Sequence, residues 1–170
     1  MTNPTSKKHL AAVVSFEDSV DKLRSCLEAL RNWVPEVTVV IQEDEDSAKE
    51  IIEEFKMSVC IHSTSTTSAR WEYGLTQINA SWVLLVRSNE IITGQLRKSI
   101  VEKIKVNADN PCQYLLKSTI IFLKKRLKYS LDWYDSQPSC LTYLPKNVAT
   151  IQKLKKNILN QISKVSNYFS

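Results

Sequence analysis

Glycine is almost absent from this chain of 170 residues, in which only Gly74 and Gly94 occur. Walker-type loops and G-x-G-x-x-G turns need several glycines in one segment, so the sequence excludes both of these phosphate-binding loops. The four cysteines contain no C-x-x-C pair and only two histidines accompany them, which favours free thiols in a reducing cytosol over a structural zinc site. No segment approaches the roughly 20 apolar residues of a membrane-spanning helix.

The remaining composition is that of one soluble globular domain, with 43% hydrophobic and 24% charged residues. Its charge is unevenly distributed. Residues 1–96 carry 9 Lys/Arg and 14 Asp/Glu, a net charge of −5, whereas residues 97–170 carry 14 Lys/Arg and 4 Asp/Glu, a net charge of +10. The basic half predicts an anionic partner such as a membrane surface or a glycolipid. Solvated helix faces without a particular ligand are the alternative.

A central strand is predicted at Trp82–Val86, a continuous run of β-forming apolar residues that suits burial on both faces. Before it, short apolar runs alternate with segments of helical periodicity. This alternation predicts a three-layer α/β fold with a mostly parallel central sheet and helices on both faces. The expected strands are 10–15, 37–41 and 57–62, and the expected helices are 19–33, 47–56, 69–79 and 93–106.

The two ends of the chain have different patterns. Residues 1–8 are polar and are expected to be disordered. Residues 133–144 are expected to be rich in turns, and residues 146–170 to form an amphipathic C-terminal helix. The main domain is therefore expected over residues 9–145. The final helix would pack on that domain, form a homo-oligomer or bind a protein partner.

The central strand ends abruptly at Arg87-Ser88-Asn89-Glu90. In open α/β sheets, ligands bind at the carboxyl ends of the strands. A functional site is therefore expected at this position.

Several short segments stand in a recognisable order along residues 9–145: Cys26–Leu30, Glu36–Ile41, Asp46, Ala69-Arg70, Gly74-Leu75, Trp82–Glu90, Phe122-Leu123 and Trp133-Tyr134. In this order the chain resembles family 2 glycosyltransferases with the GT-A (Rossmann-like) fold, in particular the bacterial branch that adds a sugar to the lipopolysaccharide core. The resemblance implies a nucleotide-sugar donor, a glycolipid acceptor and a role in cell-envelope biosynthesis.

The resemblance also implies a divalent metal, held in that family by an Asp-x-Asp motif that neutralises the diphosphate leaving group. Here Arg87-Ser88-Asn89 occupies the motif, and only the following Glu90 keeps a carboxylate. Arg87 cannot bind a metal, and Asn89 is a weak neutral ligand. We therefore expect no metal cofactor.

Other positions depart from the family pattern in the same direction. The aspartate expected to hold the nucleotide is Ile41, and the following Gln42–Glu45 is acidic where the family has small residues. Of the first-strand signature, Asp18 keeps a group that can bind a base. Tyr129 stands where the acceptor segment of the family has a histidine.

Three interpretations remain open. In the first, the protein is a metal-independent transferase in which cationic side chains stabilise the leaving group and a carboxylate deprotonates the acceptor. The nucleotide sugar would then contact Asp18, Asp46, Arg70, Arg87 and Asn89, and the catalytic carboxylate would be Asp132 or Glu90. In the second, the domain is catalytically degenerate and serves as a binding or scaffolding domain.

In the third interpretation, the basic and apolar segment around residues 117–128 lies on an anionic membrane surface. A basic helix packed on the sheet is its structural alternative. The expected acceptor or membrane contacts are Lys124, Lys125, Arg126, Lys128, Tyr129 and Trp133. We expect a cytoplasmic protein that is peripheral at the inner membrane, and no nucleic-acid partner because no nucleic-acid-binding motif is present.

Overall fold

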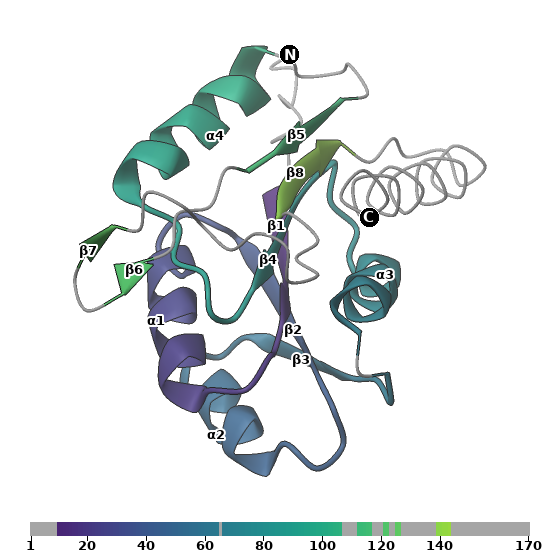
Figure 1. The fold of residues 1–170 in the computed structure, drawn as a ribbon. Coiled ribbons are helices and arrows are strands. Elements are labelled where there is room, and N and C mark those ends of the chain that lie inside the picture. Colours follow the sequence, from purple (N-terminus) through teal and green to yellow (C-terminus); the bar gives the residue numbers. More distant parts are fainter. Residues whose placement is uncertain are drawn as a thin grey trace, which may run out of the picture.

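A computed structural model of the protein describes residues 10–64, 66–106, 112–116, 121–122, 125–126 and 139–143. Within these ranges helices and strands alternate in the first half of the chain (Figure 1). The strands are β1 (Leu10–Ser15), β2 (Glu36–Ile41), β3 (Ser58–Ile61), β4 (Trp82–Arg87), β5 (Gln113–Leu115), β6 (Ile121–Phe122), β7 (Lys125–Arg126) and β8 (Cys140–Tyr143). The helices are α1 (Val20–Leu30), α2 (Asp46–Glu54), α3 (Thr67–Gln77) and α4 (Gly94–Val106).

Six of the strands form one sheet in the order β3-β2-β1-β4-β8-β5. The first four are parallel, whereas β8 runs antiparallel to both β4 and β5. The predicted α/β fold with a mostly parallel sheet is confirmed. The parallel strands need helical crossovers, and these place helices on both faces of the sheet (Figure 1).

Each face of the sheet has its own hydrophobic core. Alternate residues of β1 point to opposite faces, so Ala12 and Val14 pack with α1, α2 and α4, while Ala11 and Val13 pack with α3. The predicted central strand is buried along its apolar length, from Trp82 to Val86. In the described part of the chain, no helix has the length and apolar character needed to cross a membrane.

Two expectations for the second half of the chain need correction. Residues 140–143, expected within a turn-rich stretch, form strand β8 because they pair with β4, which is distant in the sequence. The second correction concerns the helix given as the structural alternative for the basic segment around residues 117–128. The described residues of that segment, 121–122 and 125–126, form β6 and β7, which pair antiparallel in a separate two-stranded sheet. The expected disordered residues 1–8 and the expected helix at 146–170 lie outside the described residues.

Helix α3 lies close to the sheet because it carries a glycine at the contact. A Cβ atom added at Gly74 would overlap Val13 Cγ1 and lie 3.0 Å from Val40 Cγ2. Both valines are fully buried, and their β-branched side chains have little rotamer freedom. Gly74 therefore sets the distance between α3 and the neighbouring strands β1 and β2.

We predict that Gly74→Ala destabilises the protein by about 1–3 kcal/mol, because overpacking outweighs the higher helix propensity of alanine. Gly94→Ala is the matched control, since nothing lies within 4 Å of a Cβ at that position. Urea denaturation of both variants checks the prediction. Equal stability of the two variants would show that α3 can move away from the sheet at little cost.

The four cysteines are free thiols in different surroundings. Burial raises the pKa of Cys26 to about 12 and that of Cys140 to about 11. Burial also raises the pKa of Cys60, which is only partly buried. Because the thiolate is the reactive form, burial and a raised pKa both make a cysteine unreactive.

We predict that iodoacetamide at about pH 8 modifies Cys112 and, more slowly because its pKa is raised, Cys60 in the folded protein, but Cys26 and Cys140 only after denaturation. Mass spectrometry of the labelled peptides measures the modification of each cysteine. Labelling of Cys26 at the rate of Cys112 would contradict the prediction.

The raised pKa values of Cys26 and Cys140 also predict a pH dependence of the free energy of unfolding. Their contribution to stability is present below the ordinary cysteine pKa of about 8.5 and is lost as the pH rises toward 11 to 12. Urea denaturation over this pH range measures the loss.

Candidate functional site

The sheet has a topological switch point between β1 and β4. These strands are parallel neighbours with Ser15 opposite Arg87. Strand β1 is followed by α1 and β2, which extends the sheet on one side, whereas β4 is followed by α4 and β5, which belongs to the opposite half of the sheet. Ligands of open α/β sheets bind in the crevice outside the carboxyl ends of such strands. The predicted location of the site, directly after the central strand, agrees with this topology.

Four residues from three elements join at this point: Ser15, Glu17, Thr67 and Ser88. We call them the switch-point cluster. Glu17 Oε1 accepts hydrogen bonds from Ser15 Oγ at 3.1 Å and from Thr67 Oγ1 at 3.0 Å. The backbone N–H of Glu17 donates to Ser88 Oγ at 3.0 Å. The cluster thereby fixes the orientation of a half-buried carboxylate between β1, β4 and the start of α3.

Glu90, one of the two predicted catalytic carboxylates, holds the turn after β4 together. Its Oε2 accepts a hydrogen bond from the backbone N–H of Arg87 at 3.1 Å and another from Ser139 Oγ. The Glu90 N–H donates to the Arg87 carbonyl. Ser139 directly precedes β8, so this carboxylate links the ends of two neighbouring strands.

The predicted nucleotide-sugar contacts have different local surroundings. Asp18 is exposed and pairs with Lys22 at 3.7 Å, one turn along the chain. Arg70 is only 5% exposed, and its Nε donates to the Thr64 carbonyl at 3.2 Å. Arg87 is half-buried and Asn89 is exposed at the end of β4.

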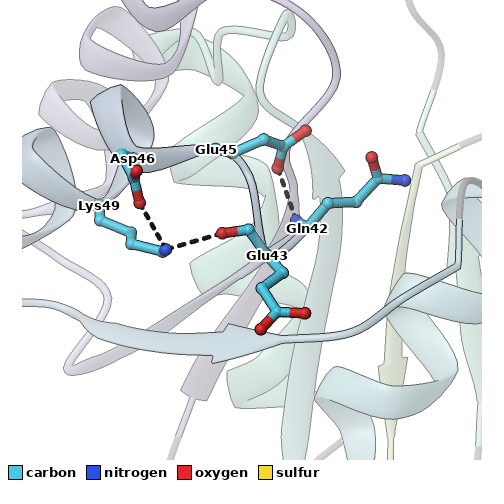
Figure 2. A network of polar contacts seen from close by, with 5 residues as sticks. All are labelled: Gln42, Glu43, Glu45, Asp46 and Lys49. Atoms are coloured by element: carbon cyan, nitrogen blue, oxygen red, sulfur yellow. Dashed lines mark hydrogen bonds and ion pairs between the residues drawn. The ribbon is translucent and has the colours of Figure 1, made fainter.

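Asp46 lies in the acidic loop between β2 and α2 (Figure 2). It is the first residue of α2 rather than the residue that caps the helix, and its carboxylate binds Lys49 Nζ at 2.7 Å. The same ammonium donates to the carbonyl of Glu43. Glu45 accepts from the backbone N–H of Gln42 at 2.6 Å. The polar groups of this loop therefore stabilise the loop itself.

The remaining predicted site residues belong to the basic and turn-rich segments. Lys125 and Arg126 form β7. The other predicted residues of these segments, Lys124, Lys128, Tyr129, Asp132 and Trp133, lie outside the described residues. Within the described residues no group of three His, Cys, Asp or Glu side chains could hold a metal ion.

Sequence reasoning missed most of the switch-point cluster. The sequence predicts a base contact at Asp18, whereas the residue that the structure places in the cluster is its neighbour Glu17. The signal that could have identified Glu17 is its position two residues after a buried strand serine. The partners Thr67 and Ser88 could not be assigned without the β1–β4 register, which is a tertiary property.

No protein-family model matches the sequence, and no curated protein matches it. Solved structures do match the fold. A cytidylyltransferase from Leptospira borgpetersenii superposes with a TM-score of 0.60 at 12% identity, covering 87% of this chain and 64% of that one. TarS from S. aureus (residues 1–349) superposes with a TM-score of 0.54 at 18% identity, covering 79% and 46%.

A third structure is CMP:2-keto-3-deoxy-manno-octonic acid synthetase in complex with CTP, with a TM-score of 0.50, 8% identity and coverage of 91% and 86%. The chain spans 64% of the cytidylyltransferase and 46% of the TarS fragment. At these identities the likeness shows the fold alone. The chain therefore shares the α/β fold of these three structures.

We predict that Glu90→Ala destabilises the protein by about 1–3 kcal/mol, because it removes the acceptor of the Arg87 N–H and of the buried Ser139 hydroxyl. Ser139→Ala should lower the free energy of unfolding by less than Glu90→Ala does. A double-mutant cycle should give a coupling energy of about 0.5–3 kcal/mol between the two residues. Glu72→Ala, at an exposed position of α3, is the control and should stay within about 0.5 kcal/mol of the parent. Equal effects of Glu90→Ala and Glu72→Ala would argue against this structural role.

Proposed function

We propose that this protein is a glycosyltransferase-like domain of cell-envelope polysaccharide synthesis that binds a nucleotide without carrying out metal-dependent transfer. The observation that carries the proposal is the position of Glu17 in the switch-point cluster. Its carboxylate is oriented by hydroxyl donors from β1 and α3, so little entropy remains to be lost when a ligand binds. Glu17 would accept hydrogen bonds from ribose hydroxyls or from the amino group of a base.

The charge at this edge of the sheet supports recognition of the nucleoside instead of the phosphates. The cationic residues in the loops and element ends at this edge are fewer than the carboxylates, and one of them, Arg70, is buried. They are Lys22, Lys49, Arg70 and Arg87. The carboxylates are Glu17, Asp18, Glu43, Asp44, Glu45, Asp46 and Glu90. Such an excess of negative charge disfavours a diphosphate.

The use of Glu90, the candidate catalytic carboxylate that lies among the described residues, supports binding without turnover. Glu90 accepts hydrogen bonds from the backbone and from Ser139. A general base must be available to take a proton from its substrate. This carboxylate is instead engaged in stabilising the fold.

The choice of nucleotide is supported by the likeness to a cytidylyltransferase and to CMP:2-keto-3-deoxy-manno-octonic acid synthetase, whose structure is a complex with CTP. The cell-envelope role is supported by the resemblance of the sequence to enzymes of lipopolysaccharide core synthesis. Cytidine nucleotides are therefore the first ligands to test, followed by those of uridine and guanosine.

We predict that CMP raises the melting temperature of the protein in the presence of EDTA and binds more tightly than CTP under the same conditions. A ligand at about 100 times its Kd raises the free energy of unfolding by about 2.7 kcal/mol. For a chain of this size, this raises the melting temperature by several degrees. Glu17→Gln should abolish the shift by removing the charged acceptor. Thermal unfolding and titration calorimetry measure both effects.

Glu53→Gln, at an exposed position of α2, is the matched control and should bind as the parent does. The absence of a shift with any nucleotide, with or without Mg²⁺, would overturn the proposal. Binding that survives in Glu17→Gln would place the ligand elsewhere on the protein.

A second candidate function is metal-independent sugar transfer, which the position of Arg87 favours. Arg87 ends β4 opposite Ser15, so it lies at the switch point, where a leaving group would be bound. The measurement is release of a nucleoside diphosphate from nucleotide sugars in EDTA. Release that is lost in Arg87→Met but kept in Arg31→Met would favour this function over binding alone.

A further inference from the structure

Strand β3 forms one edge of the sheet and pairs only with β2 among the described strands. Its sequence, Ser-Val-Cys-Ile, contains no charge and no proline. Val59 and Ile61 are 41% and 47% exposed, although both are strongly apolar. Proteins usually protect such edges with charged residues, proline or a bulge, because an open edge can pair with another strand. Besides its short length, β3 has none of these protective features.

The backbone N–H and C=O groups of β3 point alternately to the two edges of the strand. The N–H of His62 donates to the carbonyl of Ile41 in β2 at 2.9 Å. Since backbone groups of a strand alternate between its two edges, Ser58, Cys60 and His62 pair with β2, while Val59 and Ile61 direct their N–H and C=O groups to the open edge. The residues with exposed apolar side chains are thus also the residues with available backbone groups.

We propose that β3 pairs antiparallel with β3 of a second copy of this chain, which joins two six-stranded sheets into one. Such a contact has two-fold symmetry, so the same patch serves both copies. Pairing the outward groups over residues 58–62 places Val59 of one copy opposite Ile61 of the other. It also places Cys60 opposite Cys60 of the second copy, in a non-hydrogen-bonded pair on the two-fold axis.

The charges beside β3 complement each other in this arrangement. Lys56 is exposed just before the amino end of β3. In the proposed register it lies beside Thr64 of the second copy, and the Thr64 carbonyl accepts a hydrogen bond from Gln42 Nε2 at 3.3 Å. Glu43 and Asp44, both exposed, follow Gln42. Figure 2 shows the Glu43 carboxylate pointing away from Lys49, whose ammonium binds the Glu43 backbone carbonyl and the Asp46 carboxylate.

This complementarity favours a second copy of the chain over another partner. Lys56 lies at the amino end of β3, after the exposed Glu53 and after Glu54, which pairs with Arg24. Glu43 and Asp44 lie beside the carboxyl end. An antiparallel pair therefore directs each Lys56 toward the acidic loop of the other copy. A parallel pair would bring like charges together. The middle of the strand is neutral and contributes no repulsion.

The first test is the mass of the full chain in solution, measured by light scattering over a concentration series. We expect twice the 19.5 kDa of one chain at high concentration. The variant Val59→Lys/Ile61→Lys should remain a single chain, because lysines on an edge strand prevent pairing. Since both side chains are exposed, the melting temperature should stay near that of the parent.

The second test uses the register. Cα atoms of a non-hydrogen-bonded pair lie about 4.5 Å apart, which is within the range of a disulfide. Diamide, which removes two electrons and two protons from a pair of thiols, should cross-link two chains through Cys60. Cys60→Ser should abolish the cross-link, whereas Cys112→Ser, at the other half-buried cysteine, should retain it.

The third test exchanges charges. Lys56→Glu and Glu43→Lys should each weaken self-association several-fold, and combining them should restore it. This rescue would not occur if the substitutions merely disturbed the fold. A single chain at all concentrations would overturn the proposal. So would a dimer that survives the lysine variant or cross-links without Cys60.

Discussion

The parallel pairing of β1 with β4 is the constraint on which the rest of the structure depends. Both strands are buried on both faces, so each needs apolar neighbours above and below the sheet. The pairing fixes Ser15 opposite Arg87 and thereby aligns the two strand ends. It also requires helical crossovers on both faces, which determine the positions of α1, α2 and α3.

This alignment explains how the polar residues at the carboxyl edge are used. Each strand end there has backbone groups that need partners, and side-chain oxygens provide them: Ser88 Oγ for the Glu17 N–H, Glu90 for the Arg87 N–H and Glu45 for the Gln42 N–H. The acidic loops therefore have a structural role. Of these carboxylates, Glu17 combines a fixed orientation, partial burial and a position at the switch point, which makes it the best candidate for contact with a ligand.

The fold was largely predictable because the strands and helices of its first half follow from the pattern of apolar residues within each segment. Runs such as Trp82–Val86 are too short for a buried helix and too apolar for a loop, and the helical segments between them carry regular periodicity. Strand β8 was not predictable in the same way. Thr142 and Tyr143 favour strands, but the segment is only four residues long and lies between Pro138 and Pro145, so its pairing with β4 and β5 is what identifies it. The β6–β7 pair likewise depends on register instead of periodicity.

The sequence by itself determined the α/β class, the central strand and the edge of the sheet where polar groups gather, because burial and strand propensity depend on the residue types within one continuous segment. The tertiary structure decided which polar groups meet. Glu17 and Thr67 are 50 positions apart, and Glu90 and Ser139 are 49 apart. Such contacts arise from the order and register of the strands, which decide which distant segments lie side by side. Neither segment alone contains a pattern that identifies its partner.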